Sequence, residues 1–217
     1  MIITTFSELT IDGKLSLGGG RSSKDLFAFY GPELGRWFHQ QRATHDAIMV
    51  GAGTVRSDNP ELTVRNVPGK SPLRVIPLGM TCLPQESLIL NDGLRTLLIV
   101  PSRHPQTYDN LAVETISCGT TSVDLRELTE LLSRRGIKSL MVEGGSRLLH
   151  SFFRENLVDR IVIKHIPVLS GDSSAPNYLE GAKMALSEWQ VDTWQCIGGV
   201  GVATYVRKRS DEAAVAA

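Results

Sequence analysis

The feature that most constrains the fold is a series of short apolar runs, each of strand length, that alternate with helical patterns. Four such runs lie at residues 47–50, 73–76, 97–100 and 139–142. Runs of this kind are typical of strands that are covered on both faces of a parallel sheet. Helical patterns occupy residues 32–44, the stretch after Asp124 and the stretch after Gly145. Strands that alternate with helices predict an α/β fold.

Both ends of the chain extend the predicted sheet. Residues 2–9 predict a first strand, which closes at the turn pair Asp12-Gly13. Further strands are predicted at 113–117, 159–169, 189–196 and 202–207. The last two surround a glycine-rich turn, so they should add an antiparallel edge to a mostly parallel sheet. We expect one domain over residues 1–207 and a disordered tail over 208–217.

Residue types that favour helix ends mark two of the helices. Pro32 and Glu33 predict the start of a helix that runs to about Thr44. Asp124 and Glu127 have the spacing of a capping box. In such a box the first side chain accepts from the backbone N–H of the second residue, and the second side chain accepts from the backbone N–H of the first. Gly136 predicts a left-handed end for that second helix.

Composition excludes several classes of function. The chain has 217 residues, with 23 Lys and Arg against 23 Asp and Glu, and this balance argues against nucleic acid as a partner. No apolar run approaches the length of a membrane span, and the N-terminus lacks a signal-peptide pattern. Three widely spaced cysteines and five histidines show no metal-ligand spacing, so no metal is expected. We expect a cytoplasmic protein.

A polar segment at residues 51–65 follows the apolar run 47–50. Its glycines allow a tight turn and close approach to a ligand. Thr54, Asp58 and Arg65 supply polar groups, and Asn59-Pro60 predicts that no regular element forms over the segment. Such a segment at the carboxyl end of a strand is either a solvated turn or a ligand-binding loop.

A second candidate site lies where the run 139–142 leads into Glu143-Gly144-Gly145-Ser146-Arg147 and a new helix. The free N–H groups at a helix N-terminus favour an anion such as a pyrophosphate. The stretch lacks the Gly-x-Gly-x-x-Gly fingerprint, so it does not predict a Rossmann fold. A tight turn without a ligand would explain the glycines, but it would not explain Glu143.

The candidate ligand-facing residues can bind and orient a ligand, but none of them is a strong nucleophile. They are Lys14, Arg42, Thr54, Asp58, Arg65, Glu143 and the Gly144-Gly145 turn. Arg42 could equally complement a helix dipole. Ser146 has no Gly-x-Ser-x-Gly context, and we assign no nucleophile. A site of this composition is typical of an enzyme whose cofactor supplies the chemistry.

Four motifs occur in order along the chain. They are Asp12-Gly13-Lys14, Arg42-Ala43-x-x-Asp46-Ala47-Ile48, Gly53-Thr54-Val55-x-x-Asp58-x-Pro60-x-Leu62-Thr63-Val64-Arg65 and Glu143-Gly144-Gly145. In these motifs the chain resembles the pyrimidine reductases of riboflavin biosynthesis, over about residues 2–206. These include the C-terminal domain of the bifunctional deaminase–reductase and the stand-alone reductases. The third motif is the most specific.

The resemblance implies a dihydrofolate-reductase-like, three-layer α/β/α fold with a central mixed, mostly parallel sheet. It also implies NADPH-dependent reduction of a 5-phosphoribosylamino pyrimidine to its ribitylamino product, and a homodimer. The implied cofactor contacts are Gly53, Thr54, Asp58, Gly144, Gly145, Ser146 and Arg147. The implied substrate contacts are Lys14, Ser22 or Ser23, Arg42, Leu62, Arg65 and Glu143, with Lys14 and Glu143 as the catalytic candidates.

Two departures leave questions open. Asn59 stands where many members have Asp, and the uncharged stretch 77–80 stands where relatives place an Asp near the cofactor. NADH is therefore not excluded. No zinc deaminase pattern accompanies the reductase motifs, so the sequence does not decide whether reduction precedes or follows deamination. Two alternatives are a dihydropterin or dihydrofolate reductase on the same fold, and a nucleotide-binding protein without catalysis.

Overall fold

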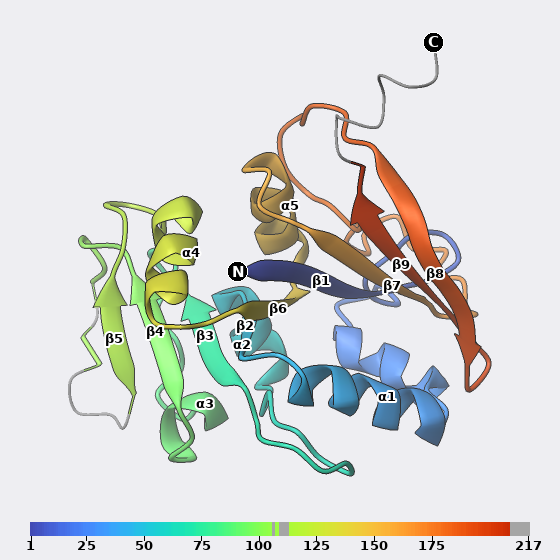
Figure 1. The fold of residues 1–217 in the computed structure, drawn as a ribbon, viewed down its shortest axis with the longest axis horizontal. Coiled ribbons are helices and arrows are strands. Elements are labelled where there is room, and N and C mark those ends of the chain that lie inside the picture. Colours follow the sequence, from blue (N-terminus) through green and yellow to red (C-terminus); the bar gives the residue numbers. More distant parts are fainter. Residues whose placement is uncertain (106, 109–112, 209–217) are drawn as a thin grey trace.

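The computed structural model describes residues 1–105, 107–108 and 113–208, and in these residues a nine-stranded sheet forms the centre of the molecule (Figure 1). Its strands are β1 (Ile2–Leu9), β2 (Ala47–Val50), β3 (Leu73–Pro77), β4 (Thr96–Val100), β5 (Glu114–Ser117), β6 (Ser139–Gly144), β7 (Arg160–His165), β8 (Trp189–Ile197) and β9 (Val200–Arg207). Their spatial order is β5-β4-β3-β2-β6-β1-β7-β9-β8.

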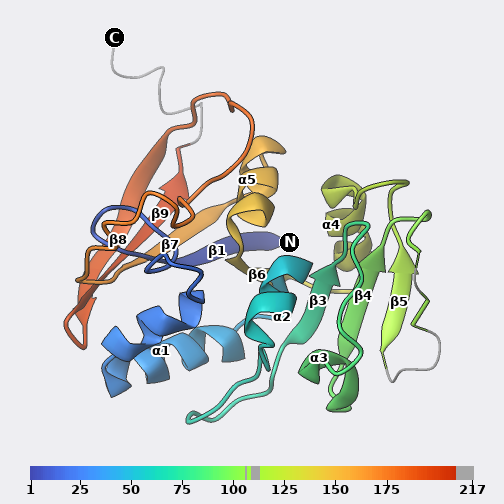
Figure 2. The same cartoon turned by 180° about the vertical axis from the view of Figure 1, so that it is seen from behind.

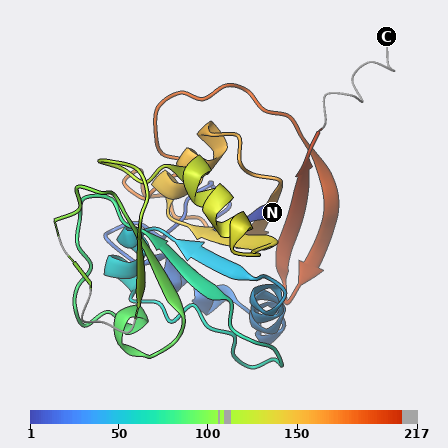
Figure 3. The same cartoon turned by 60° about the vertical axis from the view of Figure 1, so that its left-hand side comes forward.

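The sheet is mixed but mostly parallel. Strands β1 to β7 pair in parallel, and β1 lies between β6 and β7. Strand β9 is antiparallel to both of its neighbours, β7 and β8. Strands β9 and β8 form one end of the sheet (Figure 3). This arrangement confirms the predicted sheet with an antiparallel edge.

Helices cover both faces of the sheet. They are the 3₁₀ helix η1 (Ser23–Phe29), α1 (Pro32–Ala43), α2 (Ala52–Asp58), α3 (Leu88–Asn91), α4 (Leu125–Arg134) and α5 (Ser146–Arg154). Helices α4 and α5 lie in front of the sheet in Figure 1, whereas α1 and α2 lie in front of it in Figure 2. The fold is therefore a three-layer α/β/α structure.

Alternate residues of each central strand belong to different cores. In β2, Ile48 packs in the core beneath α1 and α2, with Phe38 and Val55. Met49 packs in the opposite core, with residues of α4 and α5 such as Leu128. Because both faces of the strand are buried, the run reads as continuously apolar.

The prediction that no regular element forms over residues 51–65 is wrong. Residues Ala52–Asp58 form helix α2, and Asn59 ends it in the left-handed conformation with φ 40°. Ala52 and Val55 are three residues apart and bury the same helical face, so tertiary packing stabilises a segment that is rich in turn residues. Two further elements, η1 and α3, were not predicted.

The predicted ends of elements were partly correct. Strand β7 ends at His165 instead of extending to residue 169. Asp124 caps α4 by accepting from the N–H groups of Arg126 and Glu127 at 2.9 and 3.0 Å. Glu127 does not complete a reciprocal box, because its Oε2 accepts from the N–H of Gly119 at 3.2 Å. Gly136 has φ +83°, as predicted for a left-handed end.

No helix in the described part of the chain is long and apolar enough to cross a membrane. Within the same residues, no group of three or more His, Cys, Asp and Glu side chains could hold a metal ion. The tail predicted for 208–217 lies outside the described residues, except for Lys208.

Candidate active site

A cleft of about 1350 Å³ opens at the carboxyl ends of the parallel strands. The ends of four adjacent strands line it, with Glu8 from β1, Gly51 after β2, Pro77 from β3 and Glu143 from β6. Because parallel strands point the same way, these ends meet at one edge of the sheet, where open α/β folds bind ligands. The ends of these four strands therefore share one cleft, and its use by a ligand stays a prediction.

The Gly144-Gly145 turn forms one wall of the cleft. Gly144 and Gly145 have φ angles of +101° and +70°, which side chains rarely adopt. A Cβ added at Gly145 would lie 3.3 Å from Thr54 Oγ1, so the α5 turn and helix α2 approach closely here. Helix α5 begins directly after the turn, and its free N–H groups make this wall suited to an anion.

Ser146, the first residue of α5, is already hydrogen-bonded. Its Oγ donates to the carbonyl oxygen of Asn177 at 2.9 Å, which ties the helix N-terminus to the segment after β7. Arg147 is exposed and lines the cleft beside it. The geometry therefore agrees with a structural role for the Ser146 hydroxyl.

Arg42 and Glu143 form an ion pair at the floor of the cleft. Arg42 Nε donates to Glu143 Oε1 and its Nη2 donates to Oε2, both at 2.6 Å. The side chains are only 8% and 11% exposed. Burial lowers the pKa of Arg42, but Glu143 outweighs it, so the pKa of this guanidinium lies above its ordinary value. Glu143 lines the cleft, while Arg42 holds it from behind.

Asp58 joins α2 to the start of η1. Its carboxylate accepts from Ser22 Oγ at 2.7 Å and from Ser23 Oγ at 3.1 Å, and Lys24 Nζ donates to its carbonyl oxygen. Asp58, Ser22 and Ser23 all line the cleft. The structure therefore brings together a residue predicted for the cofactor and residues predicted for the substrate.

Four predicted residues do not line the cleft themselves. They are Lys14, Arg42, Leu62 and Arg65. Lys14 Nζ donates to Asn177 Oδ1 at 2.9 Å and to the carbonyl oxygen of Ala175, a residue of the cleft wall, at 3.3 Å. Leu62 is buried in the core with φ 55°, and Arg65 is an exposed residue that pairs with Glu61 at 2.7 Å.

Sequence reasoning missed a second buried charged group, formed by Glu8, Tyr30 and Lys164. Glu8 and Lys164 are register partners in β1 and β7, and Lys164 Nζ donates to Glu8 Oε1. The hydroxyl of Tyr30 donates to the same oxygen. The available signal was an ionisable residue inside an otherwise apolar strand, which must have a partner when the strand is buried.

The pKa shifts of this group have clear physical causes. Burial raises the pKa of Glu8, but the charge and hydrogen bond of Lys164 and the hydrogen bond of Tyr30 bring it below its ordinary value. Burial lowers the pKa of Lys164. Burial and the neighbouring Glu8 raise the pKa of Tyr30 well above its ordinary value. Glu8 is therefore a carboxylate, and Tyr30 is a neutral donor.

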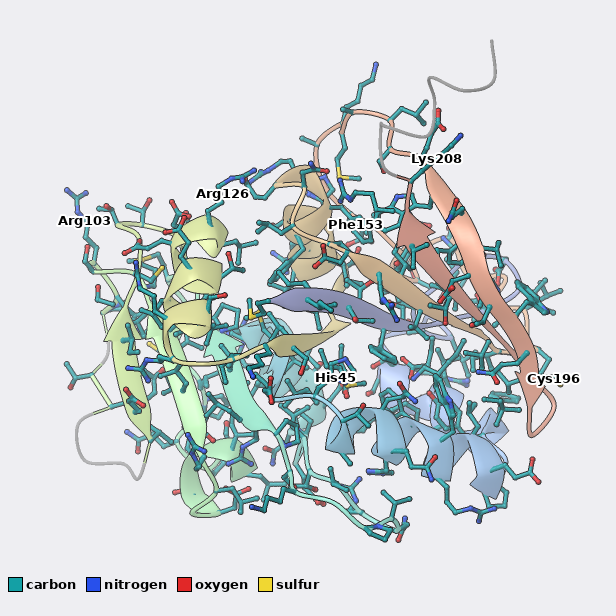
Figure 4. All side chains as sticks on the ribbon, viewed as in Figure 1. His45, Arg103, Arg126, Phe153, Cys196 and Lys208 are labelled. Carbon is teal, nitrogen blue, oxygen red and sulfur yellow. The ribbon has the colours of Figure 1, made fainter. Side chains whose placement is uncertain are left out.

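A second missed part of the wall is the segment from Gly119 to Arg126, at the N-terminus of α4. Arg126 extends from α4 toward α5 (Figure 4). Its Nε donates to Glu155 Oε2 at 3.2 Å. The uncharged residues Pro77, at the end of β3, and Leu78 and Gly79, directly after it, line the same cleft. Cations thus reach this region from α4 and α5.

The class of protein follows from comparison with known families. The family model described as the RibD C-terminal domain matches residues 1–201, and the chain belongs to this family. A relative from Aquifex aeolicus (strain VF5), 2,5-diamino-6-ribosylamino-4(3H)-pyrimidinone 5′-phosphate reductase, is 41% identical over 180 residues, which are 81% of this chain and 80% of the relative.

Two further comparisons agree with this family. The reductase of the same name from Methanothermobacter thermautotrophicus is 36% identical over 179 residues, which are 80% of this chain and 81% of that protein. The structure of Acinetobacter baumannii RibD, form 2, matches with a TM-score of 0.80 at 21% identity and shows the same fold. The match covers 95% of this chain but only 58% of the Acinetobacter chain.

Proposed function

We propose that this protein reduces a 5-phosphoribosylamino pyrimidine to its ribitylamino product in riboflavin biosynthesis, with NADPH as the hydride donor. The candidate substrates are the 2,5-diamino-pyrimidinone and its deaminated form, 5-amino-6-(5-phosphoribosylamino)uracil. The observation that carries the proposal is one cleft that joins a glycine turn at a helix N-terminus, Gly144-Gly145, to a fixed carboxylate, Glu143. The 41% identity to the Aquifex reductase supports the same activity.

The cofactor is assigned to the wall formed by α2 and the N-terminus of α5. Gly144, Gly145, Ser146 and Arg147 would hold the pyrophosphate, because backbone N–H groups and a cation converge there. Gly53, Thr54 and Asp58 would line the same ligand from α2. When bound, the dinucleotide supplies the hydride, and the protein residues bind it and exclude water.

The substrate is assigned to the floor between Glu143 and the two serines at the start of η1, Ser22 and Ser23. Glu143 is held by Arg42 in one geometry, so it can accept a hydrogen bond from a substrate hydroxyl or amino group without reorganising. Ser22 lines the opposite side, and Lys14 fixes the wall at Ala175. Leu62 and Arg65 would contribute through the segment after α2, and Lys14 and Glu143 remain the catalytic candidates.

The direct test is turnover of the two candidate pyrimidines by the purified protein. Consumption should appear as loss of reduced-nicotinamide absorbance, and the ribitylamino product should be identified by mass spectrometry. Glu143→Gln should lower kcat/KM for the pyrimidine more than it weakens NADPH binding, and Glu188→Gln, at an exposed surface pair, is the control. Absence of turnover with both pyrimidines would reject the proposal.

The same assays separate the two alternatives. Turnover of dihydrofolate in preference to the phosphorylated pyrimidines would favour a dihydrofolate-type reductase. Calorimetric binding of NADPH without turnover of any of these substrates would favour a non-catalytic binding protein.

NADPH is the proposed cofactor in preference to NADH. Arg126, Arg147 and Arg154 line the cleft and supply cations that suit the 2′-phosphate of NADPH. Titration of both dinucleotides should give tighter binding of NADPH, and its advantage should shrink in Arg126→Gln or Arg154→Gln. Equal affinities in the unmodified protein would contradict this assignment.

We further propose a cytoplasmic homodimer with one domain over residues 1–207. The edge strand β8 exposes Val191 at 58% and Trp194 at 62%, an apolar surface suited to a second copy. Light scattering should give twice the chain mass, and Trp194→Glu should give the single chain mass. Limited proteolysis should leave residues 1–207 in one piece, and cell fractionation tests the compartment.

A further inference from the structure

The group of Glu8, Tyr30 and Lys164 lies beside the Arg42–Glu143 pair on the same face of the sheet. Lys164 Nζ lies 3.3 Å from the centroid of the Phe38 ring, and Arg42 Cζ lies 4.9 Å from the same centroid. Phe38 is therefore a shared partner of both cations. The two carboxylates, Glu8 and Glu143, belong to the neighbouring strands β1 and β6, and both line the cleft.

Each carboxylate has its own buried counter-charge. Lys164 is fully buried and pairs with Glu8, as Arg42 pairs with Glu143. Two acceptor groups can therefore face the cleft without adding net negative charge. This matters because both reactants under the proposed function carry phosphates, which unpaired carboxylates would repel.

Glu8 keeps one oxygen available. Both of its donors, Lys164 Nζ and the hydroxyl of Tyr30, bind Oε1. Neither of these side chains binds Oε2, and the Glu8 side chain is 14% exposed at the cleft. Buried ion pairs stabilise folds weakly compared with apolar packing. If Glu8 and Lys164 served only to stabilise the fold, two apolar residues would serve as well.

We propose that Glu8 reads the pyrimidine ring and makes the protein select the 2,5-diamino-pyrimidinone over the uracil. This inference rests on the proposed function. The 2-amino group and the adjacent ring N–H of the diamino compound are both donors, and the two lone pairs of Oε2 can accept from them. The uracil has a carbonyl oxygen in place of the 2-amino group, and this oxygen would face the carboxylate and be repelled.

The magnitude of the selection follows from the chemistry of the contact. A site built to accept from a substrate N–H rejects an analogue that lacks it, because buried polar groups stay unpaired. The protein should therefore prefer the diamino compound by about 100-fold or more in kcat/KM. Reduction would accordingly precede deamination in the reaction sequence.

The test compares kcat/KM for the two pyrimidines in the unmodified protein and in Glu8→Gln. The variant should lose about 10- to 100-fold with the diamino compound, because a charged hydrogen bond is lost. With the uracil it should stay within a few fold or gain, since the amide can turn its NH₂ toward the carbonyl. Glu188→Gln, at an exposed pair, should leave both values unchanged.

A second variant controls for misfolding of the first. Glu8→Gln leaves Lys164 buried without its counter-charge, so Glu8→Gln/Lys164→Met is made in parallel, and thermal unfolding is recorded for each protein. The selectivity ratio should fall in whichever variant folds. The ratio is the informative quantity, because a purely structural defect lowers both rates together.

Three outcomes overturn the inference. Equal use of the two pyrimidines by the unmodified protein overturns it without any variant. An equal loss for both substrates in Glu8→Gln also overturns it, because Glu8 would then contact the shared ribose phosphate or act only on the fold. If the unmodified protein turns over neither pyrimidine, the proposed function fails and this inference fails with it.

Discussion

Replacing one partner of the Arg42–Glu143 pair should destabilise the protein far more than replacing both. Glu143→Leu leaves the guanidinium of Arg42 in a site where its side chain is 8% exposed. Arg42→Met leaves the carboxylate of Glu143 in a site where its side chain is 11% exposed. The double variant removes both charges and replaces them with apolar side chains.

The geometry sets the size of the effect. Two charge-assisted hydrogen bonds of 2.6 Å join the side chains, and Arg42 Nη1 donates a third to the carbonyl oxygen of Thr63 at 3.1 Å. Breaking a buried pair costs about 3–5 kcal/mol, whereas replacing it with apolar residues is often close to neutral. Glu143 faces the cleft, where water relieves part of the penalty. We therefore expect about 3 kcal/mol for each single variant and less than about 2 kcal/mol for the double variant.

Urea unfolding of the four proteins gives a double-mutant cycle. The coupling energy should be about 4 kcal/mol or more, with the slope m unchanged. In thermal scans, each single variant should lower Tm by roughly 6–12 °C, given about 2–4 °C per kcal/mol for a chain of this size. Additive effects of the two substitutions would refute the argument, because they would show that the two charges do not depend on each other.

Three further predictions address stability elsewhere. Gly145→Ala should lower the free energy of unfolding by about 1–3 kcal/mol, since φ is +70° there. Gly35→Ala, in a helix and with open space around it, should be neutral or raise that energy by up to about 1 kcal/mol; urea unfolding of both variants checks this contrast. Asp92→Asn should lower Tm by roughly 6–20 °C, because it leaves Arg74, which is 1% exposed, without its counter-charge; equal Tm values would contradict this. The hydrogen bond from Arg74 lowers the pKa of Asp92 in the folded protein below its ordinary value of 3.8, so the unfolded state takes up the proton first as pH falls. The stability that this pair contributes is therefore complete above pH 3.8 and is lost as pH falls through the folded pKa. This pH-dependent part should be missing from the stability profile of Asp92→Asn.

Local patterns in the sequence determined most of the elements. Strands such as β2 and β6 were predictable because both of their faces are buried, which gives continuous apolar runs. Helix α4 was predictable because Asp124 caps it and its leucines repeat at helical spacing. The glycine turn at Gly144-Gly145 was predictable for the same reason: its conformational requirement is local.

Tertiary structure alone decided how the site is assembled. Helix α2 forms because Ala52 and Val55 find a core to pack against, which outweighs the turn-forming residues around them. Glu143 meets Arg42 across 101 residues of sequence. No local pattern encodes that pairing.

The Glu8–Lys164 pair shows the same limit most clearly. The two residues are 156 positions apart, and they meet only because β1 and β7 pair in parallel in a register that places one opposite the other. A shift of one residue in that register would turn one side chain to the opposite face of the sheet. The sequence determined that each charge lies in a strand, and the strand pairing decided which charges neutralise each other.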